Sequence, residues 1–410
     1  MTRYWLTHKY NDNWEACRLQ AAVDTMTSFE SAKTSAMNAA RSLFHTTDNT
    51  LSPPSSKNAL DVPNNFTIDS NVIKKFPGGA KIISAHETVT SAWTTTAQLQ
   101  LQMDDGSEET YFLKSASGDH GRIMMEGEFN SMSELYTWAP DFVPKPHSWG
   151  EYAKGGPDTY FFLSQFLQMG DAMPDPEYLC SRLARLHRDS HSPTGKFGFH
   201  TTTCQGRTAQ CVGWEENWTV FFTKLLQHVI DLDSKVNGYW ESLDKVEKRL
   251  IKHVIPRLLD ALVSDGRSIK PSLLHSDLWE GNTGTSASDG RVYIFDAASF
   301  YGHNEMEVAN WRGYYNKISD KVYTNTYLSY SPPGEPKAEW EDRNCLYSIY
   351  YNVIYSVNHE SQGTAVRQLA FRDMYYLVDK FAPFFEGEAP SRLQESEYAS
   401  LSAKRDHTRA

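Results

Sequence analysis

The sequence predicts an α+β fold, with a small antiparallel sheet followed by a larger helical region. Residues 95–103, TTAQLQLQM, alternate apolar side chains with polar ones, which is typical of a half-buried strand. The turn signal DDGS at 104–107 separates this run from a second β-rich run at 110–114. Residues 160–166, YFFLSQF, predict a third strand. Together these runs favour an antiparallel sheet in the first half of the chain.

Beyond residue 170 the apolar residues recur at helical spacing. The stripes lie in residues 179–186, 218–229, 246–262 and 346–357. Two β-rich islands interrupt this helical half, LLHSDLWEGN at 273–282 and VYIFDAAS at 292–299. A sheet lobe followed by a helical lobe predicts a ligand cleft between the two.

Composition excludes several classes of protein. The chain has 410 residues and a formal net charge of −11, so a general binder of nucleic acid is not expected. It contains no apolar run long enough to cross a membrane, and its first residues lack the apolar core of a secretory signal. The five cysteines are scattered without a CxxC pair, which favours a reducing, cytoplasmic location.

The organisation along the chain predicts four parts. We expect a mobile N-terminal extension at 1–65 with a short helix at 31–44, because the segment is rich in Ser, Thr, Asn and Ala. A sheet lobe at 66–168 and a helical lobe at 169–386 follow. The polar residues 387–410 predict a frayed tail.

The two islands carry acids and an amide at a spacing that suits phosphoryl transfer. His275, Asp277 and Asn282 match the pattern H-x-D-x-x-x-x-N, and Asp296 ends the following strand. Such a reaction needs an acid that takes the proton of the acceptor hydroxyl, and hard oxygen ligands for a divalent metal. Alone, Asp277 could cap a helix, and Asn282 or Asp296 could punctuate a turn. The combination favours a metal–nucleotide site.

The same residues resemble the fructosamine kinase (ketosamine-3-kinase) family. The family pattern is close to H-G-D-L-W-x-G-N followed by D-P-A-x-Y-Y-G-H-x-E-x-[DE]-[LI]-A, and the chain has HSDLWEGN at 275–282 and FDAASFYGHNEMEVA at 295–309. Upstream, the resemblance includes Leu113-Lys114, MEGEF at 125–129, LARLH at 183–187, FGF at 197–199, Gln210, Trp214 and Trp218. It covers about residues 80–385.

The resemblance implies a bilobal, protein-kinase-like fold and ATP-dependent phosphorylation of a ketosamine at its 3-hydroxyl, on a small molecule or a glycated protein. It assigns Asp277 as catalytic base and gives Mg²⁺ to Asn282 and Asp296. Lys114 would bind the α and β phosphates and pair with Glu128. The hinge that reads adenine through its backbone would include Gln165, Phe166 and Leu167.

The substrate side is less specified. Candidate contacts are His275, Trp279, His303, Glu305 and Trp218. The ordinary alternatives are that His275 buttresses its loop, that His303 and Glu305 stabilise the segment after the metal ligand, and that the tryptophans belong to the core.

The chain departs from the family pattern at three places. Ser276 stands where the family has Gly, which matters if that position requires a positive φ. Ala297 replaces Pro, and the expected nucleotide-covering loop at 84–95 contains no Gly. Hydroxyls of Ser84, Thr88, Thr90 and Ser91 could substitute for backbone contacts to phosphate. A small-molecule kinase of the aminoglycoside or choline type and a non-catalytic pseudokinase remain alternative interpretations.

Overall fold

The computed structural model describes residues 60–61, 67–91, 93–153, 158–170, 172–359 and 363–390. The expected N-terminal extension, apart from Leu60 and Asp61, lies outside the described residues, as does the expected tail beyond residue 390. The chain divides into two compact units that are discontinuous in sequence. The first unit takes residues up to 186, 277–299 and 311–330, and the second takes 187–276, 300–310 and 331 onward.

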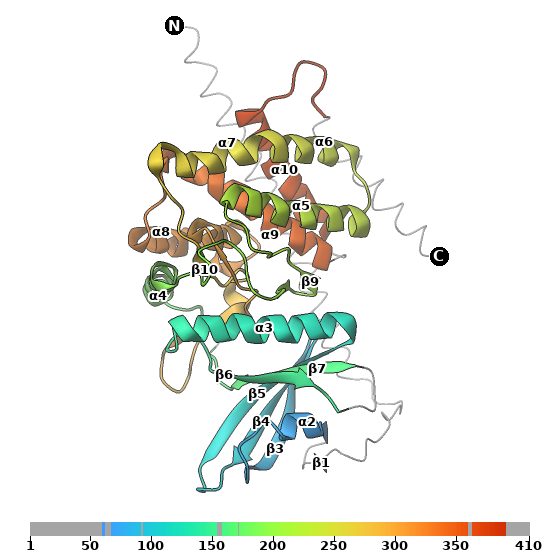
Figure 1. Cartoon of the computed structure of the whole chain (residues 1–410), viewed down its shortest axis with the longest axis vertical. Coiled ribbons are helices and arrows are strands. Elements are labelled where there is room, and N and C mark those ends of the chain that lie inside the picture. The colour runs from blue at the N-terminus through green and yellow to red at the C-terminus, as the bar shows by residue number, and fades with distance from the viewer. Residues whose placement is uncertain are drawn as a thin grey trace, which may run out of the picture. The chain divides into compact units, whose positions relative to one another are not determined.

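A five-stranded antiparallel sheet forms the centre of the first unit (Figure 1). Its strands are β3 (Lys81–Thr90), β4 (Thr95–Gln102), β5 (Glu108–Ser117), β6 (Pro146–Glu151) and β7 (Thr159–Gln165), in the spatial order β3-β4-β5-β7-β6. The three strands predicted from the sequence are confirmed as β4, β5 and β7.

One expectation about this sheet is wrong. We expected residues 84–95 to form a loop, but β3 continues to Thr90 and β4 begins at Thr95. The reason is local composition, since a run of Ser, His, Thr and Val without Gly suits a pleated strand better than an open loop.

The sheet buries the face that its alternation predicts. Ala97, Leu99 and Leu101 of β4 are fully buried. The short helix α2 (Ser70–Ile73), whose N-terminus is capped by the Asp69 carboxylate, contributes Val72 to the same core. Helix α3 (Gly118–Trp138) packs against β5, β6 and β7 (Figure 1).

The first unit also contains the hairpin that carries the candidate metal ligands. Strands β11 (Thr283–Thr285) and β12 (Val292–Ile294) follow the 3-10 turn η3 (Glu280–Asn282). The backbone N–H of Gly170 donates to the Thr285 carbonyl at 2.8 Å, and that of Ile294 donates to the Phe142 carbonyl at 2.9 Å. These bonds connect the β11–β12 hairpin to Phe142, which precedes β6, and to Gly170, which follows β7. The remaining elements are β1 (Leu60–Asp61), β2 (Thr67–Ile68), α4 (Pro176–Asp189), η5 (Lys317–Ser319) and α8 (Lys321–Tyr330).

The second unit is mainly helical, as the apolar stripes predict. Its longer helices are α5 (Trp218–Asn237), α6 (Glu241–Arg249), α9 (Trp340–Asn358) and α10 (Gly363–Phe381). The stripe at 246–262 does not form one regular helix. It continues from α6 through a π-turn, η1 (Leu250–Val254), into α7 (Ile255–Leu259) and the 3-10 segment η2 (Asp260–Gly266). Pro256, which has no N–H to donate, follows the π-turn.

Helix α9 is the centre of this unit. All of its residues except Glu341 and Tyr355 are buried, and it packs against α5 and α10. Two-stranded ribbons join β8 (Cys204–Gln205) to β9 (Thr208–Ala209) and β10 (Ser272–Leu274) to β13 (Phe300–Gly302). The 3-10 segments η4 (Asn304–Arg312) and η6 (Lys337–Glu339) complete the elements. A helix buried on all sides belongs in a core.

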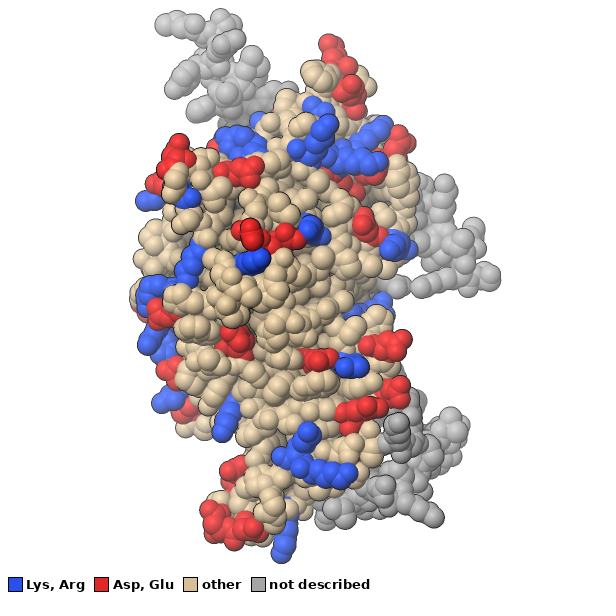
Figure 2. All heavy atoms as spheres, viewed as in Figure 1, with Lys and Arg blue, Asp and Glu red and all other residues tan. Residues whose placement is uncertain are grey.

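Acidic and basic side chains are interspersed over the face shown in Figure 2. Among the described residues, no helix has the length and apolar character needed to cross a membrane.

Candidate active site

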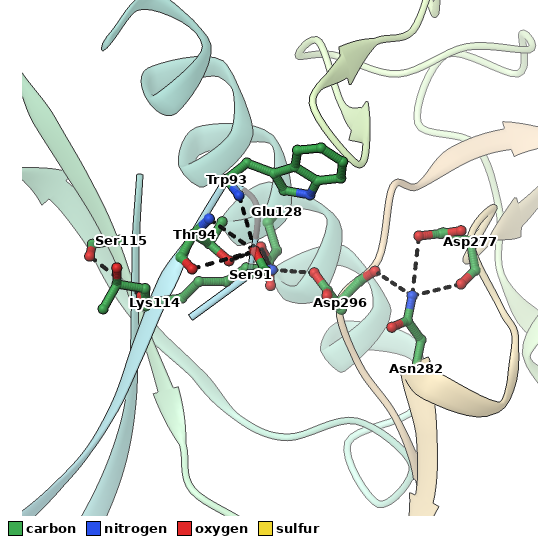
Figure 3. A network of polar contacts seen from close by, with 10 residues as sticks. Ser91, Trp93, Thr94, Lys114, Ser115, Glu128, Asp277, Asn282 and Asp296 are labelled. Atoms are coloured by element: carbon green, nitrogen blue, oxygen red, sulfur yellow. Dashed lines mark hydrogen bonds and ion pairs between the residues drawn. The ribbon is translucent and has the colours of Figure 1, made fainter. Parts of the chain in front are cut away.

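The central strand of the sheet delivers Lys114. In β5 this residue lies opposite Thr96 of β4 and Phe162 of β7. Its side chain is only 9% exposed, and its ammonium is 2.8 Å from Glu128 Oε2. The ammonium also donates a short hydrogen bond to Asp296 Oδ1 (Figure 3). A buried lysine needs such partners, because an unpaired charge in a sheet interior is costly.

Helix α3 supplies the predicted partner. Glu128 is buried on the side of α3 that faces the sheet. Glu126, two residues earlier, instead lies 3.6 Å from Arg122 on the outer part of the helix. The helical period therefore separates the two acids of the MEGEF segment and selects Glu128.

Two acids, Glu128 and Asp296, lie beside the single ammonium of Lys114. Burial alone lowers the pKa of Lys114, but the carboxylates of Asp296 and Glu128 outweigh it, so the pKa lies above its usual range. Burial raises the pKa of Glu128 to about 8, against the opposing effect of Lys114. One ammonium thus serves two carboxylates, and the Asp296 side chain remains 48% exposed. The cluster is chemically suited to accept a further cation.

Asn282 links the two acids that the sequence placed far apart. Its Nδ2 donates to the Asp277 carbonyl at 2.8 Å and is 3.2 Å from Asp277 Oδ2 and 3.4 Å from the Asp296 carbonyl (Figure 3). The amide nitrogen is therefore directed at one carboxylate oxygen and two main-chain carbonyls of these acids. Mg²⁺ would instead bind the oxygen of the Asn282 amide and the half-exposed Asp296 carboxylate, and hard oxygen donors of this kind suit the metal.

Packing explains why glycine occupies position 281 in the Trp-Glu-Gly-Asn sequence at 279–282. A Cβ added to Gly281 would lie 2.3 Å from the Trp279 ring, so only glycine allows the indole to fold over this turn. The N–H of Asn282 donates to the Trp279 carbonyl at 3.0 Å, and the Trp311 indole donates to the Leu278 carbonyl at 3.0 Å. These contacts fix the loop while Trp279 itself stays 37% exposed.

The residues just before Asp277 are held by an acid that the sequence analysis did not single out. The backbone N–H groups of His275 and Ser276 donate to the Glu307 carboxylate at 2.5 and 2.9 Å. Ser276 has a φ of 62°, so the position does adopt the left-handed conformation that glycine favours. Glu307 is fully buried, and His187 Nε2 lies 3.4 Å from it. Glu307 occupies the [DE] position of the family pattern, and this match is the feature of the sequence that could have identified it.

Four of the proposed substrate contacts are buried within the second unit. His275 is fully buried. The Trp218 indole donates to the Tyr347 hydroxyl at 2.8 Å, and His303 Nδ1 is 3.0 Å from the same hydroxyl. Glu305 is 2% exposed and accepts two bonds from Arg343. These positions favour the structural alternative, which leaves Trp279 as the exposed candidate.

In the expected hinge, Leu167 is the residue whose backbone N–H and carbonyl make no hydrogen bond among the described residues. The N–H of Gln165 donates to the Lys145 carbonyl, and that of Phe166 donates to the Thr110 carbonyl. The Gln168 carbonyl accepts from Ala287. Among the described residues, neither the N–H nor the carbonyl of Leu167 has a hydrogen-bond partner. A purine edge needs one donor and one acceptor, and Leu167 can provide both.

Comparisons with known proteins identify the relatives of this chain. The family model described as fructosamine kinase matches residues 67–369. A chloroplastic protein-ribulosamine 3-kinase of Oryza sativa subsp. indica is 31% identical over 59% of this chain and 66% of its own length. The ketosamine-3-kinase of Mus musculus is 31% identical over 62% of this chain and 84% of its own.

Solved structures agree at the level of the fold. A crystal structure described as a putative fructosamine-3-kinase from Thermobifida fusca matches with a TM-score of 0.56 at 19% identity. The match covers 73% of this chain and 95% of that one. A second, from Haemophilus somnus, matches with the same TM-score at 18% identity over 73% of this chain and 92% of that one. The predicted kinase-like α+β fold is thereby confirmed.

Proposed function

Because the chain belongs to the fructosamine kinase family, we propose that it transfers the terminal phosphoryl group of ATP to the 3-hydroxyl of a ketosamine. The observation that carries the proposal is the meeting of Asp277, Asn282 and Asp296 beside the Lys114–Glu128 pair. These groups come from distant points in the sequence and provide a base, metal ligands and a phosphate-binding cation.

Each residue has a role that its surroundings support. Asp277, whose Oδ2 lies 3.2 Å from the Asn282 amide, would orient the sugar hydroxyl and take its proton. The sugar oxygen then forms a bond to the terminal phosphorus as the bond to the ADP oxygen breaks. Lys114 would hold the α and β phosphates, with Glu128 fixing its ammonium.

The remaining contacts concern the metal and the base. Asn282 and Asp296 would hold Mg²⁺, which when bound would neutralise charge on the phosphates. The free N–H and carbonyl of Leu167 would read the adenine edge, between Phe166 and Gln168 of the hinge. Trp279 would offer its exposed indole to the acceptor, on the loop that carries Asp277.

The biological consequence would be removal of sugar adducts. A phosphate at the 3-position is a better leaving group than a hydroxyl, so the phosphorylated ketosamine would eliminate inorganic phosphate, and hydrolysis of the resulting imine by water would release the amine. Ribulosamines and fructosamines, free or on proteins, are the substrates we propose to test. An aminoglycoside and choline belong in the same panel, because they represent the alternative small-molecule kinases.

The test is phosphate transfer from Mg-ATP to this panel of acceptors. We expect transfer to a ketosamine that falls about 10²- to 10⁴-fold in Asp277→Asn, because the base is lost. Asp289→Asn is the matched control, since Asp289 is an exposed acid in the turn between β11 and β12. Absence of transfer to every ketosamine, or equal loss in both variants, would refute the proposal.

A further inference from the structure

The turn between β3 and β4 lies close to Lys114 along the sheet. Strand pairing sets Thr96 directly opposite Lys114, and Thr90 opposite Thr95. Thr94 precedes Thr96 by two residues, a distance of about 7 Å along a strand. A nucleotide whose phosphates contact Lys114 would therefore lie within reach of residues 91–94.

The Ser91 hydroxyl fills the inside of this turn. Its Oγ accepts the backbone N–H of Trp93 at 3.3 Å and that of Thr94 at 3.0 Å (Figure 3). The Ser91 N–H donates to the Thr94 carbonyl at 2.8 Å, and the two hydroxyls are 2.9 Å apart. The Thr94 side chain is buried. Three of the four residues of the turn thus direct their backbone N–H groups at atoms of the turn itself.

Two successive backbone N–H groups that converge on one oxygen are a known device for binding anions. In kinases, a glycine-rich loop covers the phosphates of the nucleotide. Here the oxygen that receives both N–H groups is the chain's own Ser91 hydroxyl. The turn therefore holds a neutral internal acceptor at the place where a phosphate oxygen would bind.

Other hydroxyls of the β3–β4 hairpin also have hydrogen-bond partners. Thr88 Oγ1 is 2.8 Å from Thr96 Oγ1, and the Ser84 hydroxyl donates to Gln100 at 3.2 Å. The Thr90 side chain lies outside the described residues. Three of the hydroxyls that the sequence suggested as substitutes for glycine N–H groups, those of Ser84, Thr88 and Ser91, are thus used in contacts within the β3–β4 hairpin.

We propose that Ser91 limits nucleotide affinity by occupying the anion-binding position of its own turn. The phosphates are then held by Lys114 and the metal ligands, and receive no main-chain hydrogen bonds from Trp93 and Thr94. Ser91 is a positioning residue, since it acts through the turn. This inference rests on the proposed function, because it requires a nucleotide beside Lys114.

The test compares the affinity of the full chain for Mg-ATP and for adenosine by calorimetry. In Ser91→Gly the two N–H groups become available, and we expect Mg-ATP to bind roughly tenfold tighter, as befits new hydrogen bonds to a charged group. Adenosine has no phosphate, so its affinity should stay unchanged. Ser91→Ala, which removes the hydroxyl but adds less flexibility, should tighten Mg-ATP binding in the same direction.

Thr88→Val is the control, because it removes a hydroxyl of the same hairpin outside the turn and should alter neither affinity. Weaker or unchanged Mg-ATP binding in both Ser91 variants, with thermal melting showing folded protein, would overturn the inference and leave the proposed function intact. A wild-type protein that binds neither Mg-ATP nor adenosine would remove the proposed function itself, and this inference with it.

Discussion

The Lys114 cluster of the first unit and the Arg343 cluster of the second both bury a cation among acids, yet they differ in one respect. Arg343 is fully buried, and its guanidinium donates to Glu305 and to the carbonyls of Gly334 and Pro336. Glu305 also accepts the Gly334 N–H at 2.7 Å. The Lys114 cluster instead contains a second acid, Asp296, that is half-exposed.

The pKa values of the two buried glutamates record this difference. Burial raises the pKa of Glu305, but His303 and Arg343 together hold it below its usual range. Burial raises the pKa of Glu128 to about 8; Lys114 opposes this rise, and the neighbouring Asp296 carboxylate adds to it. Comparable burial therefore gives opposite shifts. A closed set of charges stabilises the fold, whereas a set that lacks a cation and reaches solvent marks a ligand site.

The largest expected effect is on catalysis at the open cluster. Asp296→Asn removes a carboxylate that would hold the metal, so we expect phosphate transfer to fall by about 10²-fold or more, since metal stabilisation supplies several kcal/mol. The melting temperature should change little, because Asn282 and Glu128 keep their partners. Initial rates and thermal melting measure both quantities. A large loss of stability would show that Asp296 belongs to a structural set.

The closed cluster should respond in the opposite way. Arg343→Met leaves Glu305 buried without its cation, and we expect a loss of about 3–5 kcal/mol in the free energy of unfolding. Urea denaturation measures this loss. The double variant Glu305→Leu/Arg343→Met should recover part of it, because no charge is then left unpaired. A double variant less stable than Arg343→Met would contradict the interpretation.

A smaller effect is expected at Ser276, the last residue of the second unit before the sequence continues in the first unit at Asp277. Ser276 has a φ of 62°, and among the described residues its buried hydroxyl has no hydrogen-bond partner. Ser276→Gly should therefore stabilise the protein by about 1 kcal/mol, after the entropy of glycine in the unfolded chain is subtracted. Ser276→Ala removes the same hydroxyl but keeps Cβ, so it should gain less. Urea denaturation of both variants decides, and the prediction fails if Ala is the more stable.

A pH-dependent effect is expected at Glu247, an acid of the second unit that resembles Glu128 in its pKa. Burial raises the pKa of Glu247 to about 8, with Asp233 adding to the rise. A folded-state pKa above the unfolded value means that stability falls as pH rises from about 4.5 to about 8. The melting temperature of Glu247→Gln should match that of the wild type at pH 5 and exceed it at pH 8.5. Glu241→Gln, on the exposed side of the same helix, should show no such divergence.

The sequence predicted the parts of the fold whose periodicity is regular. The alternation at 95–103 and the stripe at 218–229 gave β4 and α5, and both buried the expected faces. The stripe at 246–262 could not reveal its π-turn, because a backbone adjustment of one residue leaves the apolar pattern almost unchanged. The family pattern predicts a loop at residues 84–95, but the local β propensity of this segment makes most of it part of strand β3.

The residues of the candidate site likewise divide into those that the sequence predicts and those that it does not. Spacing and resemblance selected Lys114, Glu128, Asp277, Asn282 and Asp296, which the structure brings together. They did not single out Glu307, although it occupies the [DE] position of the family pattern, because an acid that binds backbone N–H groups has no partner residue type that would indicate its role. Nor could they separate Trp218, His303 and Glu305 from a substrate pocket, since burial decides that question and depends on the packed fold.

The division of the chain into discontinuous units has a consequence for how this protein can be cut. The first unit needs residues 277–299 and 311–330, which are synthesised after much of the second unit. A fragment ending near residue 170 would keep Lys114 and Glu128 but lose Asp296, and would also lose the β11–β12 strands that bond to Gly170. Truncation libraries or split-protein reporters should therefore avoid breakpoints between residues 114 and 296, because a cut there separates Lys114 from Asp296.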